Sequence, residues 1–529
     1  MSVGKILKEF LKKYKFKTLL IVLSILVVTI MALLPAQVLR IIVDQVIPSG
    51  DGNRLLLAAI VYVITYVLVG MTTFVKDILM LSFSQQFMKR LRYFMMKHIG
   101  KLSYTSLVNT DSGNLEAYFN NDVNALNELF TSGVVSMITD LLKMVGILIS
   151  IFIYSTIFGW IVLGVIPVLL LFTSVVRKGM LKAQLKTKFL EGNVNKILLE
   201  NVENMEQIKV NKAEAYAGKK YIHILKNHFK ASQASNFYDA VFSPVMQLIR
   251  STLICVILLL SGWKPALFGM SIGMIISAIA LLTDLFSPIE NLGMELQTIQ
   301  KSIAALKRIN AFFKMETDEE KLSLEVQDYT LQYQNVSFRY QEKEVIQDFS
   351  LTISPGEKIV LQGPSGAGKS TLMKLAMGLL KPTLGEVKVG NQAVYLLNDT
   401  IRKELFSIVY QDPFFSGDSI YEEICLKDAS ITKERVREVL DYVGLNYIQD
   451  IDQKLNPAYY SSGELALFNI ARMMIRNPKI IFLDEMNAKL DPITSKTIIA
   501  LINEYAKDKT VISINHYGAA LDNAKIIQL

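Results

Sequence analysis

The chain has 529 residues, of which 51% are hydrophobic, and its mean hydropathy is +0.34. These values argue against a single soluble domain and favour a membrane-embedded part joined to at least one further domain. The net charge of +8 is assigned to segments facing an anionic membrane surface and not to nucleic-acid binding, because the basic residues flank the apolar stretches. Two cysteines, Cys255 and Cys425, cannot form a disulfide framework, and a zinc centre is not expected.

Six apolar stretches are predicted to be transmembrane helices, because each is long enough to cross roughly 30 Å of hydrocarbon. Their approximate ranges are 19–39, 55–75, 136–157, 158–176, 241–262 and 265–287. The first stretch follows a lysine-rich N-terminus and is too long for the core of a signal peptide, so no cleavable signal peptide is expected.

The links between these stretches alternate between short and long. The two long links, about 76–135 and 177–240, are rich in lysine and are predicted to be helical. Basic links remain on the cytoplasmic side of a membrane. The sequence therefore predicts a multi-pass protein of the cell membrane with a cytoplasmic N-terminus and a cytoplasmic C-terminal domain.

Four charged residues fall within or beside the apolar stretches: Asp140, Lys143, Arg250 and Asp284. The favoured interpretation places all four near the cytoplasmic ends, where they reach water or pair with one another. A functional role stays open for Arg250, which could line a polar cavity and face Asp140 or Asp284.

The last part of the chain changes in character. Pro288 ends the final apolar run, and a helical segment continues through Phe312. From 329 onward, short β-branched runs alternate with helix-like segments, which predicts an α/β domain with a partly parallel sheet. The domains are predicted as a transmembrane domain at 1–315, an acidic linker at 316–328 and an α/β domain at 329–529.

The strongest chemical signal is a glycine-rich loop between a predicted strand, 358–362, and a helix expected from Leu372 onward. Its glycines allow backbone N–H groups to surround a phosphate, and the helix N-terminus adds a positive dipole. Lys369 is predicted to reach the β- and γ-phosphates of a nucleotide, and Ser370 to hold Mg²⁺. The loop consists of Gly363, Pro364, Ser365, Gly366, Ala367, Gly368, Lys369, Ser370 and Thr371.

A second signal is an apolar run from Lys479 that ends in Asp484 and Glu485. This pattern places two carboxylates at the C-terminal edge of the sheet, where nucleotides bind in such folds. Asp484 is predicted to hold Mg²⁺ through water, and Glu485 to polarise the attacking water.

With these motifs, region 329–529 resembles the nucleotide-binding domain of ABC transporters, and the whole chain resembles an exporter-type half-transporter. The resemblance implies an α-helical six-span domain joined to an α/β P-loop domain that binds ATP and Mg²⁺. It also implies roles for four further residues: Tyr340 stacks on adenine, Gln411 senses Mg²⁺, Asp491 belongs to the D-loop and His516 contacts the γ-phosphate. Segments 113–115, 121–123 and 203–214 resemble the family's coupling regions.

The sequence also departs from the family pattern. The signature motif, ideally Leu-Ser-Gly-Gly-Gln, corresponds here to residues 460–464, Tyr-Ser-Ser-Gly-Glu. The resemblance implies that Ser461 and Gly463 bind the γ-phosphate of ATP held by a second subunit, whereas Ser462 adds a Cβ where close backbone approach is expected. The D-loop has unusual residues at 488–489, and the family's further strand and helix after His516 are not expected.

These features together predict a subunit that hydrolyses ATP, with Lys369, Glu485 and His516 as catalytic residues, and exports a substrate. Its partner is a second half-transporter, either identical or unlike. A peptide of the bacteriocin type is the first-ranked cargo, and a lipid or an amphiphilic drug is the alternative. A leader-cleaving peptidase domain before 19–39 is not expected. A regulatory membrane module that binds ATP without pumping stays open as a different class, whereas the six apolar stretches argue against a soluble ATPase.

Overall fold

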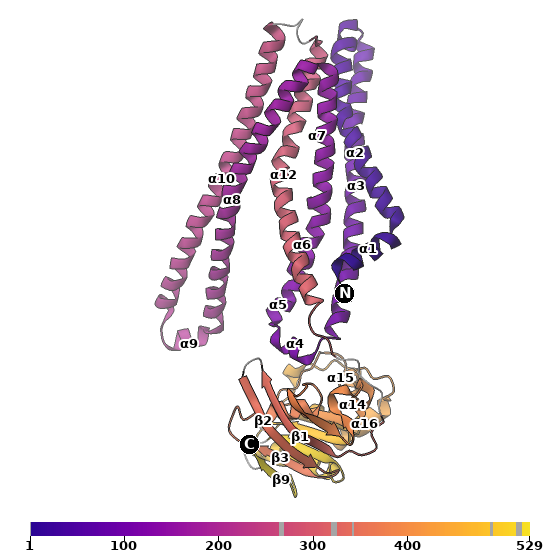
Figure 1. The fold of residues 1–529 in the computed structure, drawn as a ribbon, viewed down its shortest axis with the longest axis vertical. Helices are drawn as coiled ribbons and strands as arrows, with labels where there is room; N and C mark the ends of the chain where they lie inside the picture. Colours follow the sequence, from indigo (N-terminus) through magenta and orange to yellow (C-terminus); the bar gives the residue numbers. More distant parts are fainter. Residues whose placement is uncertain (1, 264–268, 319–324, 341–342, 487–489, 515–520) are drawn as a thin grey trace. The chain divides into compact units, whose positions relative to one another are not determined.

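The computed structural model describes residues 2–529 except 264–268, 319–324, 341–342, 487–489 and 515–520. The chain forms two compact units (Figure 1). The first comprises Met1–Gly100 and Asp111–Met315, and the second comprises Lys101–Thr110 and Glu316–Leu529. The second unit therefore consists mostly of the C-terminal part of the chain, together with one short segment from its N-terminal part.

The first unit is helical, and six of its described segments are long and apolar enough to cross a membrane, which confirms the six predicted stretches. A short helix, α1 (Val3–Lys13), precedes them and buries Val3, Ile6 and Phe10. The long helices are α2 (Lys15–Ile41), α3 (Gly52–Ile99), α7 (Val134–Tyr154), α8 (Thr156–Glu203), α10 (Glu214–Trp263) and α12 (Ile272–Phe312). As the sequence predicted, the last helix continues past Pro288.

Three of these helices extend far beyond the thickness of a bilayer. Helices α3, α8 and α10 contain 48, 48 and 50 residues. At 1.5 Å per residue each is about 72 Å long or more, against roughly 30 Å of hydrocarbon. The connecting elements are the helices α5 (Ser112–Ala117), α6 (Val123–Glu128) and α9 (Met205–Val210), the π-helical segments η1 (Ile42–Val46), η3 (Tyr118–Asp122) and η4 (Leu129–Gly133), and the 3₁₀ helix η2 (Ile47–Ser49).

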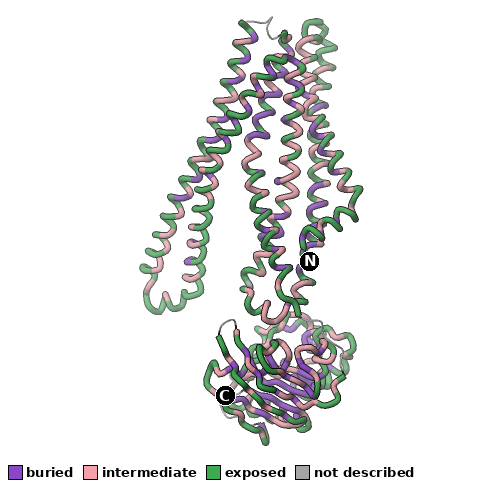
Figure 2. The backbone as a smooth tube through the Cα atoms, viewed as in Figure 1, coloured by how far each residue is buried: buried purple, intermediate pink, exposed green. Residues whose placement is uncertain are grey.

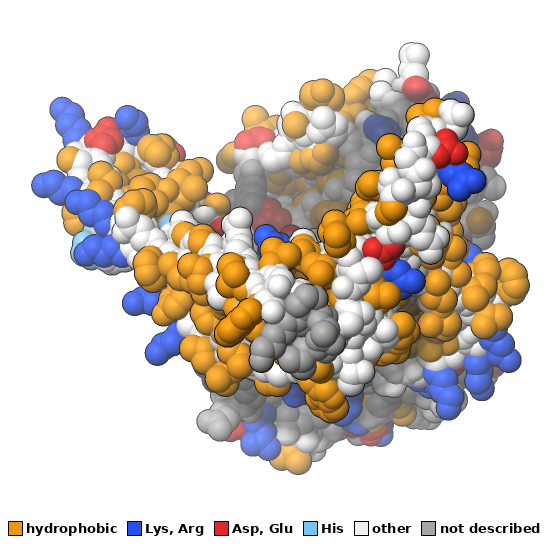
Figure 3. Space-filling model, turned by 90° about the horizontal axis from the view of Figure 1, so that it is seen from above, with side chains coloured by type: hydrophobic (Ala, Val, Ile, Leu, Met, Phe, Trp, Pro, Cys, Tyr) orange, Lys and Arg blue, Asp and Glu red, His pale blue; other side chains and the backbone are white. Residues whose placement is uncertain are grey.

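Apolar side chains on the facing sides of α7, α8, α10 and α12 form the core of this unit. Ile147, Phe158 and Leu282 lie at its centre and are fully buried. Figure 2 shows that buried positions follow the inner sides of the helices, while the outer sides are exposed. Helices α8 and α10 run side by side as an arm that ends at α9. Lys and Arg side chains gather on this arm in Figure 3.

The charged residues of the apolar stretches are placed as follows. Lys143 pairs with Asp284, with 3.6 Å between Nζ and Oδ2. The amide nitrogen of Asn291 donates to Asp140 at 3.1 Å. The pair of Lys143 and Asp284 agrees with the favoured interpretation that these charges pair with one another, and the described contacts of Asp140 and Asp284 do not include Arg250.

The second unit contains two sheets. Strands β2 (Lys343–Ile353), β1 (Leu331–Tyr340), β4 (Leu384–Val389) and β5 (Gln392–Ala393) form an antiparallel sheet in that order. Strands β6 (Phe406–Val409), β7 (Ile480–Asp484), β8 (Thr510–Ile514), β3 (Lys358–Gln362) and β9 (Lys525–Gln528) form a parallel sheet in that order. The central strands β7 and β8 are buried along almost their whole length and are rich in Ile, Val and Leu, as is typical of parallel strands covered on both faces.

Strand β9 shows that one prediction was wrong, because a further strand does follow the position of His516. Residues Ile359 to Gln362 of β3 pair with Lys525 to Gln528 in parallel register. The strand is short and mostly exposed at the edge of the sheet. Its sequence therefore lacks the apolar run by which a buried strand is recognised.

Helices pack on both sides of the parallel sheet. One apolar core lies between the two sheets and includes α13 (Lys369–Ala376), and a second includes α15 (Ile420–Cys425), α16 (Lys433–Tyr442) and α17 (Ser462–Met474). The other helical elements are α14 (Asp399–Leu405), α18 (Pro492–Tyr505) and the turns η5 (Val394–Leu396) and η6 (Pro457–Tyr459).

The early segment of the second unit carries the short helix α4 (Tyr104–Asn109). Leu102 bridges to Thr317, and the backbone N–H of Ser103 donates to the carbonyl of Glu316 at 3.0 Å. The Tyr104 ring packs against the first apolar core and lies 5.6 Å from the ammonium of Lys374. Segment 101–110 thus belongs to this unit and lies just before segment 113–115, which the resemblance indicated as a coupling region.

Candidate nucleotide site

The glycine-rich loop joins β3 to α13, as predicted from the sequence. The helix begins at Lys369, three residues before the expected start. Gly366 and Gly368 have φ of +88° and +90°, a region that side chains with a Cβ rarely adopt. A Cβ at Gly368 would also lie 3.2 Å from the carbonyl oxygen of Val345. The loop is therefore held against β2 in a conformation that requires glycine.

The side chain of Lys369 is buried within this loop. Only 6% of the residue is exposed, and its Nζ donates to the carbonyl oxygens of Gly363 at 2.8 Å and Pro364 at 3.0 Å. Ser370 is exposed and Thr371 is buried. The ammonium is thus directed back into the loop, where it can interact with any anion that the loop encloses.

Asp484 and Glu485 lie at the same edge of the parallel sheet as this loop. One strand, β8, separates β3 from β7, so the two strand ends are about 10 Å apart. Burial, followed by the adjacent charge of Glu485, raises the pKa of the half-buried Asp484 carboxyl. Glu485 has φ of +46°, and its N–H donates to the carbonyl of Ile514 at 3.2 Å.

The donor set at this edge fits a magnesium ion that also binds phosphate. Ser370 and Asp484 offer a hydroxyl and a carboxylate, which are oxygen ligands of the kind that Mg²⁺ prefers. Among the described residues no group of three or more His, Cys, Asp or Glu could hold a metal ion without further ligands. A hydroxyl and a carboxylate suffice on the protein side, because protein-bound Mg²⁺ usually keeps several waters and takes its other ligands from substrate phosphates.

Tyr340 and Gln411 lie on loops or strand ends of the same unit. Tyr340 is the last residue of β1, and its half-buried ring packs edge-on against Phe338 at 4.9 Å. It pairs in register with Lys343 of β2, the strand that also contacts Gly368. Gln411 is exposed two residues after the end of β6, the neighbour of β7.

A buried ion pair, which sequence reasoning missed, holds the segment that follows Gln411. Arg472 of α17 donates through Nη2 to Glu423 Oε2 at 2.6 Å and through Nη1 to the carbonyl of Phe414 at 2.8 Å. The side chains of Arg472 and Glu423 are 14% and 3% exposed. Glu423 also accepts from the hydroxyl of Ser416 at 2.6 Å. No local sequence pattern links two residues so far apart, so only the fold reveals the pair.

The altered signature motif forms the start of α17. Ser461 is the N-cap of this helix, and its hydroxyl accepts from the backbone N–H of Glu464 at 3.3 Å. The Glu464 carboxylate accepts in return from the N–H of Ser461 at 2.8 Å and from the hydroxyl of Tyr447. Gly463 packs against Thr494, since a Cβ there would lie 2.9 Å from the Thr494 methyl group.

Asp491 caps the neighbouring helix α18. Its carboxylate accepts from the backbone N–H groups of Ile493 and Thr494, both at 3.0 Å. Because Thr494 also contacts Gly463, the predicted signature and D-loop segments are adjacent in this unit. His516 and the unusual positions 488–489 lie outside the described residues.

The Glu464 capping contacts lead to a prediction about pH. Hydrogen bonds, the largest from Tyr447 and the next from Ser461, lower the pKa of Glu464. A lowered pKa means that the stabilisation is present above the unfolded value near 4.3 and is lost as the pH falls through the folded value. We expect Glu464→Gln to reduce stability at pH 7 by about 1 kcal/mol, which lowers the unfolding midpoint by about 2 °C. Thermal unfolding at pH 7 and pH 4 measures this change.

The difference between wild type and this variant should begin to shrink at pH 4, because the carboxylate of the unfolded chain already takes up a proton there, whereas the folded one, with its lowered pKa, resists protonation. Glu404→Gln, at an exposed position of α14, is the matched control and should not show this pH dependence. A difference that is equal at both pH values would contradict the assignment.

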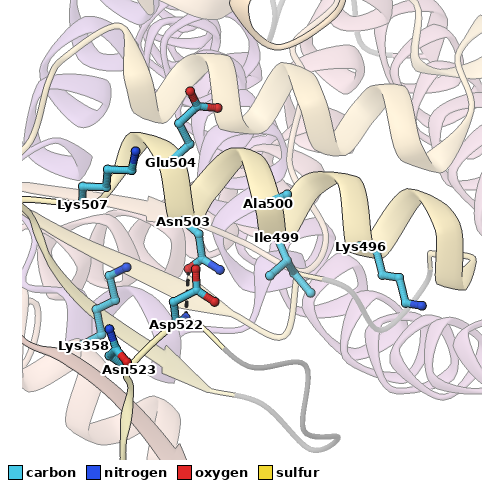
Figure 4. A pocket seen from close by; sticks show the side chains of 9 residues that line it. All are labelled: Lys358, Lys496, Ile499, Ala500, Asn503, Glu504, Lys507, Asp522 and Asn523. Carbon is cyan, nitrogen blue, oxygen red and sulfur yellow. Dashed lines mark hydrogen bonds between the residues drawn. The ribbon is translucent and has the colours of Figure 1, made fainter.

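A separate cavity of about 810 Å³ lies between α18 and the start of β3 (Figure 4). Its lining includes Lys358, Asn503 and Asp522, and the N–H of Asp522 donates to the amide oxygen of Asn503 at 3.2 Å. Lys358 is the first residue of β3, whereas the glycine-rich loop follows the last. This cavity is therefore at the end of the sheet where β3 begins, opposite to the end that carries the glycine-rich loop. Its lining contains none of the predicted site residues.

Comparisons with known proteins agree with this arrangement. The family model "ABC transporter transmembrane region" matches residues 18–289, and the model "ABC transporter" matches residues 346–488. The putative ABC transporter ATP-binding protein exp8 of Streptococcus pneumoniae is 23% identical over 99% of this chain and 92% of its own length. The mesentericin-Y105 transport/processing ATP-binding protein MesD of Leuconostoc mesenteroides is 26% identical over 95% of this chain and 71% of its own length.

The fold is also that of a solved exporter. A bacterial Atm1-family ABC exporter with ATP bound superimposes with a TM-score of 0.79 at 19% identity, covering 97% of this chain and 93% of the other. The resemblance read from the sequence motifs is thereby confirmed. The chain belongs to the ABC transporter family, as a multi-pass transmembrane domain fused to an ATP-binding domain, and it is an ATP-hydrolysing exporter.

Proposed function

We propose that this chain is one half of a dimeric exporter that hydrolyses Mg²⁺–ATP at the sheet edge formed by β3 and β7, and that its cargo is a peptide. The observation that carries the ATPase part is the juxtaposition of the glycine-rich loop with Asp484 and Glu485 at one sheet edge. Nucleotides bind at this edge in open α/β sheets.

In this proposal Lys369 changes its hydrogen-bond partners when the nucleotide binds. Its ammonium donates to two carbonyl oxygens of its own loop, and phosphate oxygens can replace these acceptors while the backbone stays in place. A phosphate is a stronger partner than a carbonyl, because both partners are then charged. Backbone N–H groups of the loop and the start of α13 add further positive potential.

Ser370 and Asp484 would hold the magnesium ion, which neutralises charge on the phosphates when it is bound. Glu485 follows Asp484 directly and is assigned to polarise the attacking water. The positive φ of Glu485 and its backbone hydrogen bond to Ile514 fix the chain at this point. The proposed roles of Tyr340, Gln411, Asp491 and His516 follow from the family resemblance.

A second half-transporter, identical or unlike, would complete the site. Ser461 and Gly463 are proposed to contact ATP bound by that partner. The arm formed by α8 and α10 carries large exposed apolar side chains outside the predicted spans, among them Val210, Tyr216 and Phe229, which are 78%, 74% and 60% exposed. A second chain that packs against the arm would cover these side chains.

The arm also indicates the orientation in the membrane. Its residues between 177 and 240 are rich in lysine, and such segments remain in the cytoplasm. We therefore place the N-terminus, this arm and the ATP-binding unit on the cytoplasmic side. A peptide cargo is supported by relatives at low identity that include transport/processing proteins such as MesD.

The deciding experiment compares ATP hydrolysis by the full chain and by Glu485→Gln in lipid nanodiscs. Removing the carboxylate should lower the rate about tenfold or more, because general-base assistance contributes at least this much. Glu404→Gln serves as the control and should keep the wild-type rate. Equal rates for wild type and Glu485→Gln would remove the catalytic assignment of Glu485, and negligible rates for both would favour a membrane module that binds ATP without pumping.

A further inference from the structure

An acidic site lies on the seam where α7 packs against α12. Along this seam Lys143 of α7 pairs with Asp284 of α12. About one turn away on α7, Asp140 accepts a hydrogen bond from Asn291, which lies two turns after Asp284 on α12. Glu295 follows Asn291 by four residues and therefore lies on the same face of α12. Three carboxylates and one ammonium thus share the seam.

Glu295 is unusual in being both buried and incompletely bonded. Only 4% of the residue is exposed, and its Oε2 has no hydrogen-bond partner among the described residues. Among those residues the charge that acts most strongly on it is that of Asp140, which is also negative. A buried carboxylate beside a second one is costly unless a cation or a proton compensates it.

Two cations near the acidic site have contacts of their own. Lys143 pairs with Asp284, as described above. Arg177 of α8 donates to the carbonyl oxygen of Glu290 at 3.0 Å, and its guanidinium lies 4.6 Å from the ring centre of Phe242. Lys143 and Arg177 are thus directed to Asp284, Glu290 and Phe242, while Oε2 of Glu295 has no hydrogen-bond partner among the described residues.

We infer that Asp140, Asn291 and Glu295 bind a cationic group of the cargo, namely the ammonium or guanidinium of a lysine or arginine side chain. An ammonium has three donors. The carboxylates of Asp140 and Glu295 offer two acceptors, and the Asn291 amide, whose nitrogen donates to Asp140, still has its oxygen as a third. Asp140 and Asn291 are half-buried, so the acidic site is buried on one side and open on the other.

The position of the acidic site suits an early step of export. Asp140 lies one turn inside the predicted span 136–157, and Asn291 lies one turn past the predicted span 265–287. Both are at the ends of the spans assigned to the cytoplasmic side. This inference rests on the proposal that the cargo is a peptide, and it adds that the peptide is recognised by its positive charge.

The test uses the full chain in nanodiscs and two fluorescent decapeptides of one sequence, one with free lysines and one with every lysine acetylated. Wild type should bind the lysine peptide about tenfold more tightly, since a charge-assisted hydrogen bond contributes about 1.5–3 kcal/mol. Glu295→Gln and Asp140→Asn should each abolish most of this preference, and Glu295→Asp, which keeps the charge, should restore part of it. Asp77→Asn, at an exposed carboxylate of α3 paired with Lys76, should leave the preference unchanged.

The outcomes separate this inference from the proposal beneath it. Equal binding of the two peptides by wild type overturns the acidic site alone. If neither peptide binds while ATP is hydrolysed normally, the peptide cargo is wrong and the inference falls with it. A preference that persists in both Glu295→Gln and Asp140→Asn also overturns the inference.

Discussion

Replacing Lys369 by alanine should lower the rate of ATP hydrolysis about 100-fold and weaken ATP binding about tenfold. The ammonium is buried in the glycine-rich loop and is positioned by two carbonyl oxygens of that loop. Charge that develops on the phosphates is then stabilised by a donor that needs little reorganisation, and loss of one such donor costs about 100-fold or more in rate. ATPase assays in nanodiscs and binding of a fluorescent ATP analogue measure the two effects.

The matched control is Lys403→Ala, which removes an exposed lysine from α14 in the same unit. It should leave both rate and affinity at the wild-type level. If Lys369→Ala and Lys403→Ala behave alike, the glycine-rich loop is not the site of nucleotide binding. Lys369→Arg tests geometry, because the planar guanidinium keeps the charge but cannot occupy the space of an ammonium in this loop.

The second large effect concerns stability. Arg472→Ala should destabilise the ATP-binding unit by about 3–5 kcal/mol, because it leaves the Glu423 carboxylate buried without its cation. The same substitution releases the carbonyl of Phe414, which follows Gln411 by three residues. Hydrogen exchange of the full chain should show lost protection in 413–425, while strand β8 on the other side of β7 keeps its protection.

The double variant Arg472→Met and Glu423→Gln separates the cost of an unpaired charge from that of lost packing. Replacing both partners by neutral side chains of similar size should recover much of the lost stability, since no charge is then buried alone. Arg435→Ala, which breaks an exposed pair with Glu438, is the comparison and should change stability by less than about 1 kcal/mol. Destabilisation by Arg435→Ala equal to that by Arg472→Ala would contradict this account.

The sequence predicted the elements whose physical signal is local. A membrane span is an uninterrupted apolar run, so the six helices were found from composition alone. The glycine-rich loop combines residues that few other structures need, and its strand was placed correctly at Lys358–Gln362. Asp484 and Glu485 were placed at the edge of the sheet because a buried strand ends at Asp484.

Features that depend on residues distant in sequence were not predicted. The pair formed by Arg472 and Glu423, and the contact of Gly463 with Thr494, arise only when helices pack together. Strand β9 is exposed, so its apolar pattern is too weak to recognise. Which charged residues of the spans pair was left open by the sequence, and Lys143 pairs with Asp284 only because α7 packs against α12. In each case tertiary contacts decided what local sequence left open.

The early segment Lys101–Thr110 has a consequence for any attempt to divide the molecule. Its backbone pairs with 316–318, and Tyr104 covers part of the first apolar core. A polypeptide beginning at 316 would lack that cover and would present bare hydrophobic surface to water. Protease cleavage in the acidic linker would, for the same reason, leave the ATP-binding part attached to the helical part through this early loop. The ATP-binding unit of the transporter is thus assembled from two separate stretches of the polypeptide, and it is complete only when the membrane-spanning half is made with it.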